Sequence, residues 1–205
     1  AAAERAALDV ESHVHPMLGR DGETLAMDVV RDGPKDAPGL LIVSSACHGV
    51  EGYCGSGVQI ALLGDDAWRA AARQANVAVL YVHALNPYGF SWVRRTTHEN
   101  VDLNRNFIDF AGRLPENLEY DGLAEAVKPL EWTQEAQAAS RAVLLAYARE
   151  HGFPALVQAL SGGQYRHADG IFYGGAGETW SRKTLTAIFR ERLSAASDVG
   201  LIDYH

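Results

Sequence analysis

The chain has 205 residues, and its 18 lysines and arginines against 26 aspartates and glutamates give a formal net charge of −8. Proteins that bind nucleic acid normally carry a basic excess or a segregated basic patch, and this sequence has neither, so we expect no nucleic-acid partner. Hydrophobic residues make up 47% and charged residues 21%, which excludes a disordered chain. The length fits a single domain with one substantial core.

The sequence contains two cysteines, Cys47 and Cys54. They are too few for a disulfide framework and wrongly spaced for a CxxC metal or redox motif, so a reduced, cytoplasmic setting is expected. The longest apolar runs, such as 77–82, have the length of a strand and fall short of the roughly 18–20 residues that cross a bilayer. We therefore expect no membrane span and no membrane partner. The sequence does not indicate an oligomeric state.

The first part of the chain predicts a β-loop-α-β unit. The alanine-rich segment 1–8 favours a short helix, and partial alternation of apolar and polar residues over 24–30 favours a half-buried strand. Continuous apolar runs at 40–43 and 77–82 are typical of strands covered on both faces. The segment 57–75 between them has helical length. Such a unit usually forms a parallel strand pair with a right-handed crossover.

The second part begins with a polar and aromatic segment, 87–106, whose lack of a clear period predicts a long functional loop. A helix is predicted over 133–150, with Thr133 as its N-cap residue. Three further elements are expected in chain order: a strand over 156–160, a helix over 178–197 and an apolar run over 199–204.

His48 and Glu51 are the first candidate functional residues, and they follow the strand predicted over 40–43. Side chains three apart on one helical turn have Cβ atoms about 5–6 Å apart, so both can reach one cation. Zinc accepts histidine nitrogen together with carboxylate oxygen. The carboxyl ends of strands in an α/β sheet are also where ligands bind. A bare HxxE match is weak, and the alternative is a loop histidine beside a solvated glutamate.

Arg95, Asn104 and Arg105 form a second candidate group. A guanidinium matches a carboxylate in a bidentate arrangement and stays charged at any working pH. Asn104 and Arg105 can therefore hold a substrate carboxylate, while Arg95 can face a developing oxyanion. The alternative is that Asp102 pairs with one of the arginines on a solvated surface, which would contribute little energy. The third candidate, His205, is the last residue of the sequence.

Five motifs follow one another along the chain: CHGVEGYCGSGVQ, HALNPYGFSWVRR, ENVDLNRNF, GGQYRHADGIFYGG and IDYH. Together they resemble the DUF2817 family, a branch of the zinc carboxypeptidase (peptidase M14) superfamily, from about His15 to His205. The resemblance implies an α/β fold with a mixed, mostly parallel sheet flanked by helices. It also implies a zinc ion held by His48, Glu51 and His205.

The superfamily further implies that Arg95 polarises the scissile carbonyl and that Asn104 and Arg105 bind the free carboxylate of the substrate. Such an enzyme lowers the pKa of a zinc-bound water, which attacks an amide carbonyl with help from a glutamate general base. The resemblance therefore implies a metallohydrolase of the carboxypeptidase type acting on small peptides. An N-acyl amino acid deacylase, similar to aspartoacylase and succinylglutamate desuccinylase, is the alternative, because acyl amino acids present the same carboxylate.

The sequence departs from the superfamily pattern in three places. The general-base glutamate lies beyond the third zinc ligand in the superfamily, so we expect residues 1–205 to be a single incomplete catalytic domain that lacks its C-terminal part. A non-catalytic metal-binding fragment is a further alternative. Cys47 replaces a threonine or asparagine, and we interpret it as a small buried side chain rather than a ligand. His98 is interpreted as a histidine at the surface or the pocket rim.

Overall fold

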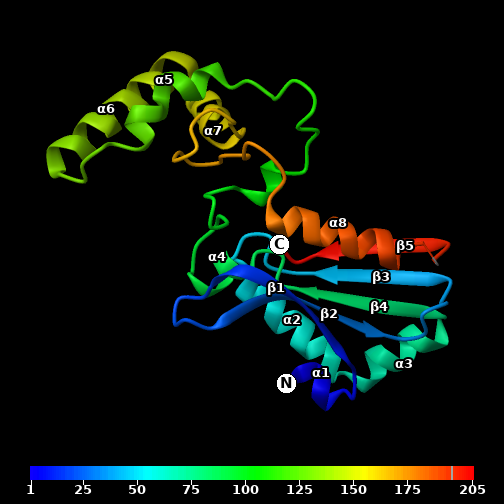
Figure 1. Ribbon diagram of the computed structural model, residues 1–205. Coiled ribbons are helices and arrows are strands. Elements are labelled where there is room, and N and C mark those ends of the chain that lie inside the picture. The colour runs from blue at the N-terminus through cyan, green and yellow to red at the C-terminus, as the bar shows by residue number, and fades with distance from the viewer. Residues whose placement is uncertain (195) are drawn as a thin grey trace. The chain divides into compact units, whose positions relative to one another are not determined.

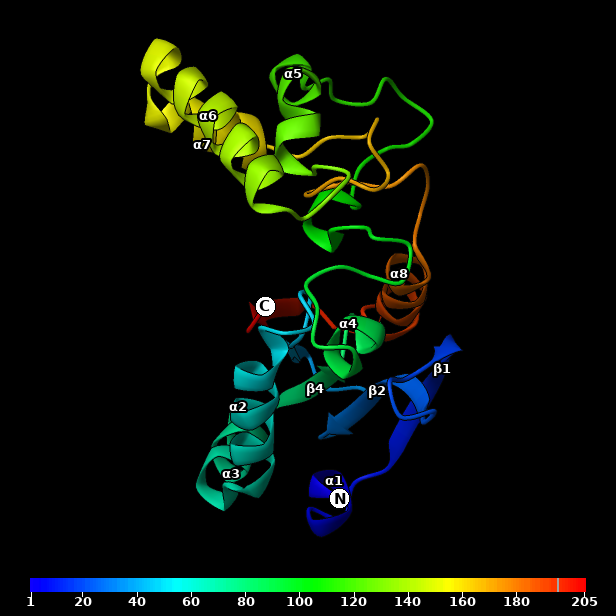
Figure 2. The same ribbon diagram turned by 90° about the vertical axis from the view of Figure 1, so that its left-hand side faces the viewer.

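The computed structural model describes residues 1–194 and 196–205. The chain forms two compact units, one made of residues 1–98 and 180–205 and the other of residues 99–179. Figures 1 and 2 show the chain from two directions. The elements of the first unit are, in chain order, α1 (Ala2–Arg5), β1 (Val10–Leu18), β2 (Thr24–Asp32), β3 (Gly39–Ser44), α2 (Gly52–Gly64), α3 (Asp66–Gln74), β4 (Val77–His83), α4 (Pro87–Ser91), α8 (Trp180–Arg192) and β5 (Asp198–Asp203). The second unit contains the 3-10 helix η1 (Leu103–Arg105) and the helices α5 (Leu118–Val127), α6 (Gln134–His151) and α7 (Phe153–Ser161).

A five-stranded sheet in the order β1-β2-β4-β3-β5 organises the first unit. Strand β2 is antiparallel to both of its neighbours, whereas β3 is parallel to β4 and to β5. All strands except β2 therefore run in one direction. Helices α2 and α3 cover one face of the sheet, and α8 lies on the other (Figure 2). The predicted α/β fold with a mixed, mostly parallel sheet between helices is confirmed, as is the parallel pairing of 40–43 with 77–82.

The two central strands are buried because both faces of the sheet are covered. Their apolar runs supply much of the core, with Val43 on β3 and Val79 and Tyr81 on β4 nearly inaccessible to solvent. These side chains pack with Leu63 of α2 and Ala3 of α1 in one cluster. Burial of this apolar surface fixes the carboxyl end of β3, from which the candidate site begins.

The prediction of one helix over 57–75 was wrong in its boundaries. The chain instead forms α2, which begins at Gly52, and α3, which begins at Asp66. Asp65 separates them in an extended conformation, and its side chain accepts hydrogen bonds from the backbone N–H groups of Ala67 and Trp68. An aspartate in this role is a strong N-cap, so it starts a new helix where the sequence suggested continuity.

The strand predicted over 156–160 was also wrong, because this segment lies within α7. Pro154 stands in the first turn of that helix, a position that suits its fixed φ angle and missing N–H. A short apolar run is compatible with either a buried strand or a helix face, and the period alone does not separate them. Strand β1 and helix α5 were not predicted, and the segment 87–106 contains α4 and η1.

The remaining predicted elements are confirmed within a few residues of their ends. Helix α6 begins after Thr133, whose Oγ1 accepts a hydrogen bond from the N–H of Ala136, as expected for its N-cap. The helix predicted over 178–197 is the shorter α8, and the apolar run over 199–204 forms most of β5. No helix among the described residues is long and apolar enough to cross a membrane.

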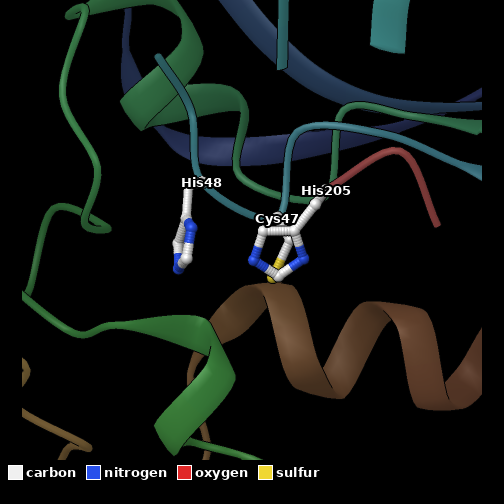
Figure 3. A group of neighbouring side chains, drawn as sticks. All are labelled: Cys47, His48 and His205. Carbon is white, nitrogen blue, oxygen red and sulfur yellow. The ribbon is translucent and has the colours of Figure 1, made fainter. Parts of the chain in front are cut away.

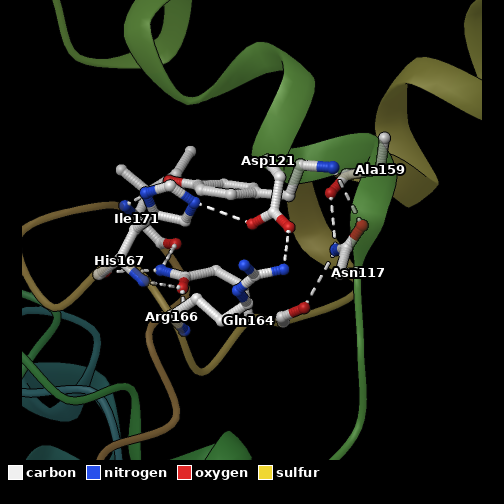
Figure 4. A network of polar contacts seen from close by, with 9 residues as sticks. Asn117, Asp121, Ala159, Gln164, Arg166, His167 and Ile171 are labelled. Atoms are coloured by element: carbon white, nitrogen blue, oxygen red, sulfur yellow. Dashed lines mark hydrogen bonds and ion pairs between the residues drawn. The ribbon is translucent and has the colours of Figure 1, made fainter.

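A buried glutamine holds together the turns of the second unit (Figure 4). Gln164 is 2% exposed, and its Oε1 accepts hydrogen bonds from the N–H groups of Arg166 and His167. Its Nε2 donates to the carbonyl oxygens of His167 and Ile171. Asp121 on α5 in turn pairs with the side chains of Arg166 and His167. These polar contacts fix the loop between α7 and α8.

Candidate metal centre

The turn between β3 and α2 carries the candidate site. It is tied to the segment after β4, because Leu85 and Asn86 donate backbone hydrogen bonds to the carbonyl oxygens of Ser45 and Ala46. Ala46 has a positive φ of 61°. A Cβ atom added at Gly52 would lie 2.6 Å from the Cα of Ala46, so only glycine allows the helix to begin this close to the turn.

The last strand brings the end of the chain to the same place. Because β5 lies parallel to β3, the carboxyl ends of the two strands meet at one edge of the sheet. Tyr204 donates a backbone hydrogen bond to Ser44, and His48 donates one to the carbonyl oxygen of His205. Two histidines from distant parts of the sequence are therefore neighbours.

Cys47, His48 and His205 form a group that can hold a metal ion. One ligand atom from each residue lies within 4.8 Å of the others. The centroids of the His48 and His205 rings are 4.4 Å apart, and the rings are nearly perpendicular. The Cys47 side chain lies beside the His205 ring (Figure 3). Histidine nitrogen and cysteine sulfur are donors that zinc accepts in tetrahedral sites. The donor set and its spacing thus fit a zinc ion.

A carboxylate orients the ring of His205. Its Nδ1 lies 3.0 Å from Oδ2 of Asp203. The other oxygen of Asp203 accepts a hydrogen bond of 2.7 Å from the hydroxyl of Ser44 on β3. A carboxylate on one ring nitrogen fixes the tautomer and orientation of an imidazole and makes the other nitrogen a stronger metal ligand. Asp203 therefore has the geometry of an outer partner of a metal site.

Glu51 connects His48 to Arg95. Its Oε2 lies 3.0 Å from Nδ1 of His48, and its Oε1 accepts a hydrogen bond of 2.9 Å from Nη1 of Arg95. Burial raises the pKa of the Glu51 carboxyl, but the hydrogen bond with His48 and the charges of His48, Arg95 and His205 together lower it below its ordinary value. The carboxyl is therefore ionised at neutral pH. The structure thus brings together His48, Glu51, Arg95 and His205 in the first unit.

The other two predicted site residues, Asn104 and Arg105, adjoin each other in η1 of the second unit. Asn104 is exposed. Nη2 of Arg105 donates a hydrogen bond of 2.6 Å to the carbonyl oxygen of Ser161, and the Tyr165 hydroxyl donates to the carbonyl oxygen of Arg105. Nε of Arg105 is buried and makes no hydrogen bond within residues 1–194 and 196–205. Their contact with a substrate stays a prediction.

Two residues of the site were missed or underestimated in the sequence. Cys47 is buried as expected, with 5% exposure, but its sulfur lies with the two histidines. Asp203 was not considered, although carboxylates often orient the histidine ligands of metal sites. His98 packs its ring 5.1 Å from that of His15 and is not part of the metal-binding group of the described residues.

The comparisons with known proteins identify a family. The profile described as "Protein of unknown function (DUF2817)" matches residues 1–205. No curated protein matches the chain. Among solved structures, glutaminyl cyclase from Porphyromonas gingivalis is similar with a TM-score of 0.31 and 10% identity, covering 98% of this chain and 70% of that chain. An aspartoacylase family protein from Mesorhizobium loti is similar with a TM-score of 0.32 and 17% identity, covering 96% of this chain and 70% of that one. These structural likenesses are too loose to bear on function, and it is the profile match that shows that the chain belongs to the DUF2817 family.

Proposed function

We propose that the protein is a zinc-dependent metallohydrolase of the carboxypeptidase type, which cleaves an amide bond next to a free carboxylate. The observation that carries this proposal is the meeting of His48 and His205 at one edge of the sheet, with Glu51 and Arg95 in contact beside them. The ordered motifs that resemble the zinc carboxypeptidase superfamily support the same conclusion. Residues 1–205 would then belong to one catalytic domain.

In this proposal His48, Glu51 and His205 hold the zinc ion. When bound, zinc would act as a Lewis acid that polarises a carbonyl and activates water for attack. Asp203 would keep the His205 ring in its binding orientation through Nδ1. Glu51, ionised at neutral pH, would add a negative charge close to both imidazoles.

Arg95 is proposed to stabilise the negative charge that develops on the carbonyl oxygen during attack. Its guanidinium lies at the site through the ion pair with Glu51. A guanidinium carries five N–H donors in a fixed plane, so contact with Glu51 and contact with a substrate oxygen are compatible. A donor already held in place at a developing oxyanion needs little reorganisation when the reaction occurs.

Asn104 and Arg105 are proposed to bind the free carboxylate of the substrate. The exposure of Asn104 and its place next to Arg105 in η1 support this role, because an amide and a guanidinium side by side can both donate hydrogen bonds to one carboxylate. Both small peptides and N-acyl amino acids end in such a carboxylate. A peptidase is the first choice, and a deacylase is the alternative that the same residues allow.

The proposal is tested by zinc analysis of the purified protein together with a substrate panel. The panel contains short peptides with a free C-terminus, the same peptides with an amidated C-terminus, and N-acyl amino acids. We expect bound zinc and cleavage of the free-carboxylate peptides only. Turnover of acyl amino acids alone would favour the deacylase, zinc without any turnover would favour a non-catalytic metal-binding protein, and the absence of zinc binding would overturn all three.

A further inference from the structure

We propose that the Cys47 thiolate is a ligand of the same metal ion, together with His48 and His205. This inference rests on the metal centre proposed above and changes its chemistry, because the Cys47 sulfur takes the place of the Glu51 oxygen and the three protein ligands leave one position open. Cys47 and His48 are adjacent in the sequence, yet both side chains are directed to the same space as that of His205 (Figure 3).

The distances within this group are close to those of a coordinated ion. Zinc binds sulfur at about 2.3 Å and histidine nitrogen at about 2.0–2.1 Å, so two ligand atoms of a tetrahedral site lie roughly 3.5 Å apart. The ligand atoms of Cys47, His48 and His205 are all within 4.8 Å of one another. Side-chain rotations that shorten these separations would close the three atoms around one ion.

The contact between Glu51 and His48 has a different character. Its 3.0 Å length is that of an ordinary hydrogen bond. Glu51 is also 47% exposed at its side chain, whereas that of His48 is 2% exposed. As the site stands in this structure, the three residues that enclose a common space are Cys47, His48 and His205.

Burial of Cys47 also favours a ligand role. Cys47 is 5% exposed and lies against imidazole rings, whereas the second cysteine, Cys54, is exposed. A soft sulfur donor selects zinc over hard cations such as magnesium or calcium. On binding, the S–H bond breaks, the proton leaves to solvent and the sulfur lone pair forms the bond to the metal. No oxidant or other reactant is needed.

The test uses cobalt(II) in place of zinc, because cobalt bound to a thiolate shows an intense sulfur-to-metal absorption band in the near ultraviolet. The full chain is loaded with cobalt(II) as wild type, as Cys47→Ser and as Cys54→Ser, the last being a matched control at the exposed cysteine. We expect the band in wild type and Cys54→Ser and its loss in Cys47→Ser. Zinc affinity, measured by competition with a chromogenic chelator, should fall at least about tenfold in Cys47→Ser, because a direct ligand is worth no less than an outer partner.

The wild-type spectrum decides the proposal even if Cys47→Ser does not fold. Cobalt bound by the wild type without the sulfur band would overturn the assignment of Cys47 and leave the proposed hydrolase intact. If the wild type binds neither cobalt nor zinc, the metal centre itself is wrong, and the proposed function fails with it. An unchanged zinc affinity in a folded Cys47→Ser variant would also overturn the assignment.

Discussion

The carboxylate of Asp203 lies 3.0 Å from Nδ1 of His205 and accepts a hydrogen bond from the hydroxyl of Ser44 through its other oxygen. It therefore joins the end of β5 to β3 and orients a proposed metal ligand at the same time. We predict that Asp203→Ala weakens zinc binding about 10–100-fold, the usual effect of removing an outer carboxylate. Chelator competition measures the affinity.

The matched control for this prediction is Asp198→Ala, at the beginning of the same strand. Asp198 accepts a hydrogen bond from its neighbour Ser197 and has no contact with the histidine pair. We expect wild-type zinc affinity in this variant. The melting temperatures of the metal-free variants show whether Asp203→Ala also destabilises β5, so that a loss of zinc affinity at unchanged stability is assigned to the orientation of His205. Equal zinc affinity in the two variants would contradict a role of Asp203 in the site.

The second prediction concerns Arg95. Its Nη1 donates to Glu51 at 2.9 Å, so Arg95→Gln removes a charge next to the metal-binding group without removing a ligand. We expect the zinc content to stay near that of the wild type and kcat for peptide hydrolysis to fall about 10²–10³-fold, as when an oxyanion donor is lost. Arg94→Gln is the control, because Nη2 of Arg94 donates a hydrogen bond to the hydroxyl of Thr96, so the same change of charge is made at the neighbouring residue. A kcat unchanged by Arg95→Gln would exclude the oxyanion role.

The third prediction compares two glycines of α2, one at its first position and one in its interior. A Cβ atom at Gly52 would overlap Ala46, whereas at Gly57 it would meet nothing within 4 Å. We expect Gly52→Ala to lower the free energy of unfolding by about 1–3 kcal/mol through overpacking. Gly57→Ala should raise it by roughly 0.5–1 kcal/mol, because alanine is the better helix former. Urea unfolding curves measure both free energies of unfolding. A Gly52→Ala variant as stable as the wild type would show that the turn at Ala46 can shift to accommodate the added Cβ atom.

The fourth prediction tests the polar network of the second unit. Gln164→Ala leaves the N–H groups of Arg166 and His167 and two carbonyl oxygens without their partner. Unpaired buried polar groups cost about 1–3 kcal/mol each, so we expect a loss of roughly 3 kcal/mol or more. Hydrogen exchange should increase over 164–172. Gln158→Ala, at an exposed position of α7, is the control, and equal stability of the two variants would contradict the role of Gln164.

The sequence predicted the local parts of this molecule better than its long-range contacts. The runs that form β3 and β4 are apolar throughout because both faces are covered, and that burial pattern is visible in the sequence. His48 and Glu51 were also found from a local signal, because a spacing of three residues places two side chains close together on one turn. The prediction of a strand in the segment that forms α7 was wrong, because its short apolar run has no periodicity that distinguishes a helix from a strand.

The meeting of His48 with His205 depends on β5 pairing with β3, which no local pattern specifies; only the family resemblance pointed to it. The direction of Cys47 was equally hidden. It follows Ala46, whose positive φ turns the chain before the histidine, and the orientation of a side chain after such a residue depends on the turn rather than on residue type. The direction of a metal-binding side chain in an irregular turn is therefore seen in the structure and cannot be predicted from the spacing of residues in the sequence.

The last prediction concerns the pH dependence of stability. Burial lowers the pKa of His83 below its ordinary value, and the charge of Asp28 on the adjacent strand opposes this effect only in part. Nε2 of His83 is buried and makes no hydrogen bond in the part of the chain that the structure describes. The unfolded chain therefore binds a proton more readily than the folded one, so the free energy of unfolding should fall as the pH drops from about 8 to about 5, through the ordinary histidine pKa.

His83→Leu removes this group and should flatten the dependence, most clearly below about pH 6.5, where an unperturbed histidine becomes charged. His151→Gln is the matched control, because His151 is exposed at the end of α6 and its substitution should leave the slope as in the wild type. Urea unfolding at the two ends of the pH range measures the difference for each variant. A slope that persists in His83→Leu would assign the acid sensitivity to other groups, since the linkage between proton binding and stability requires a titrating group whose pKa differs between the two states.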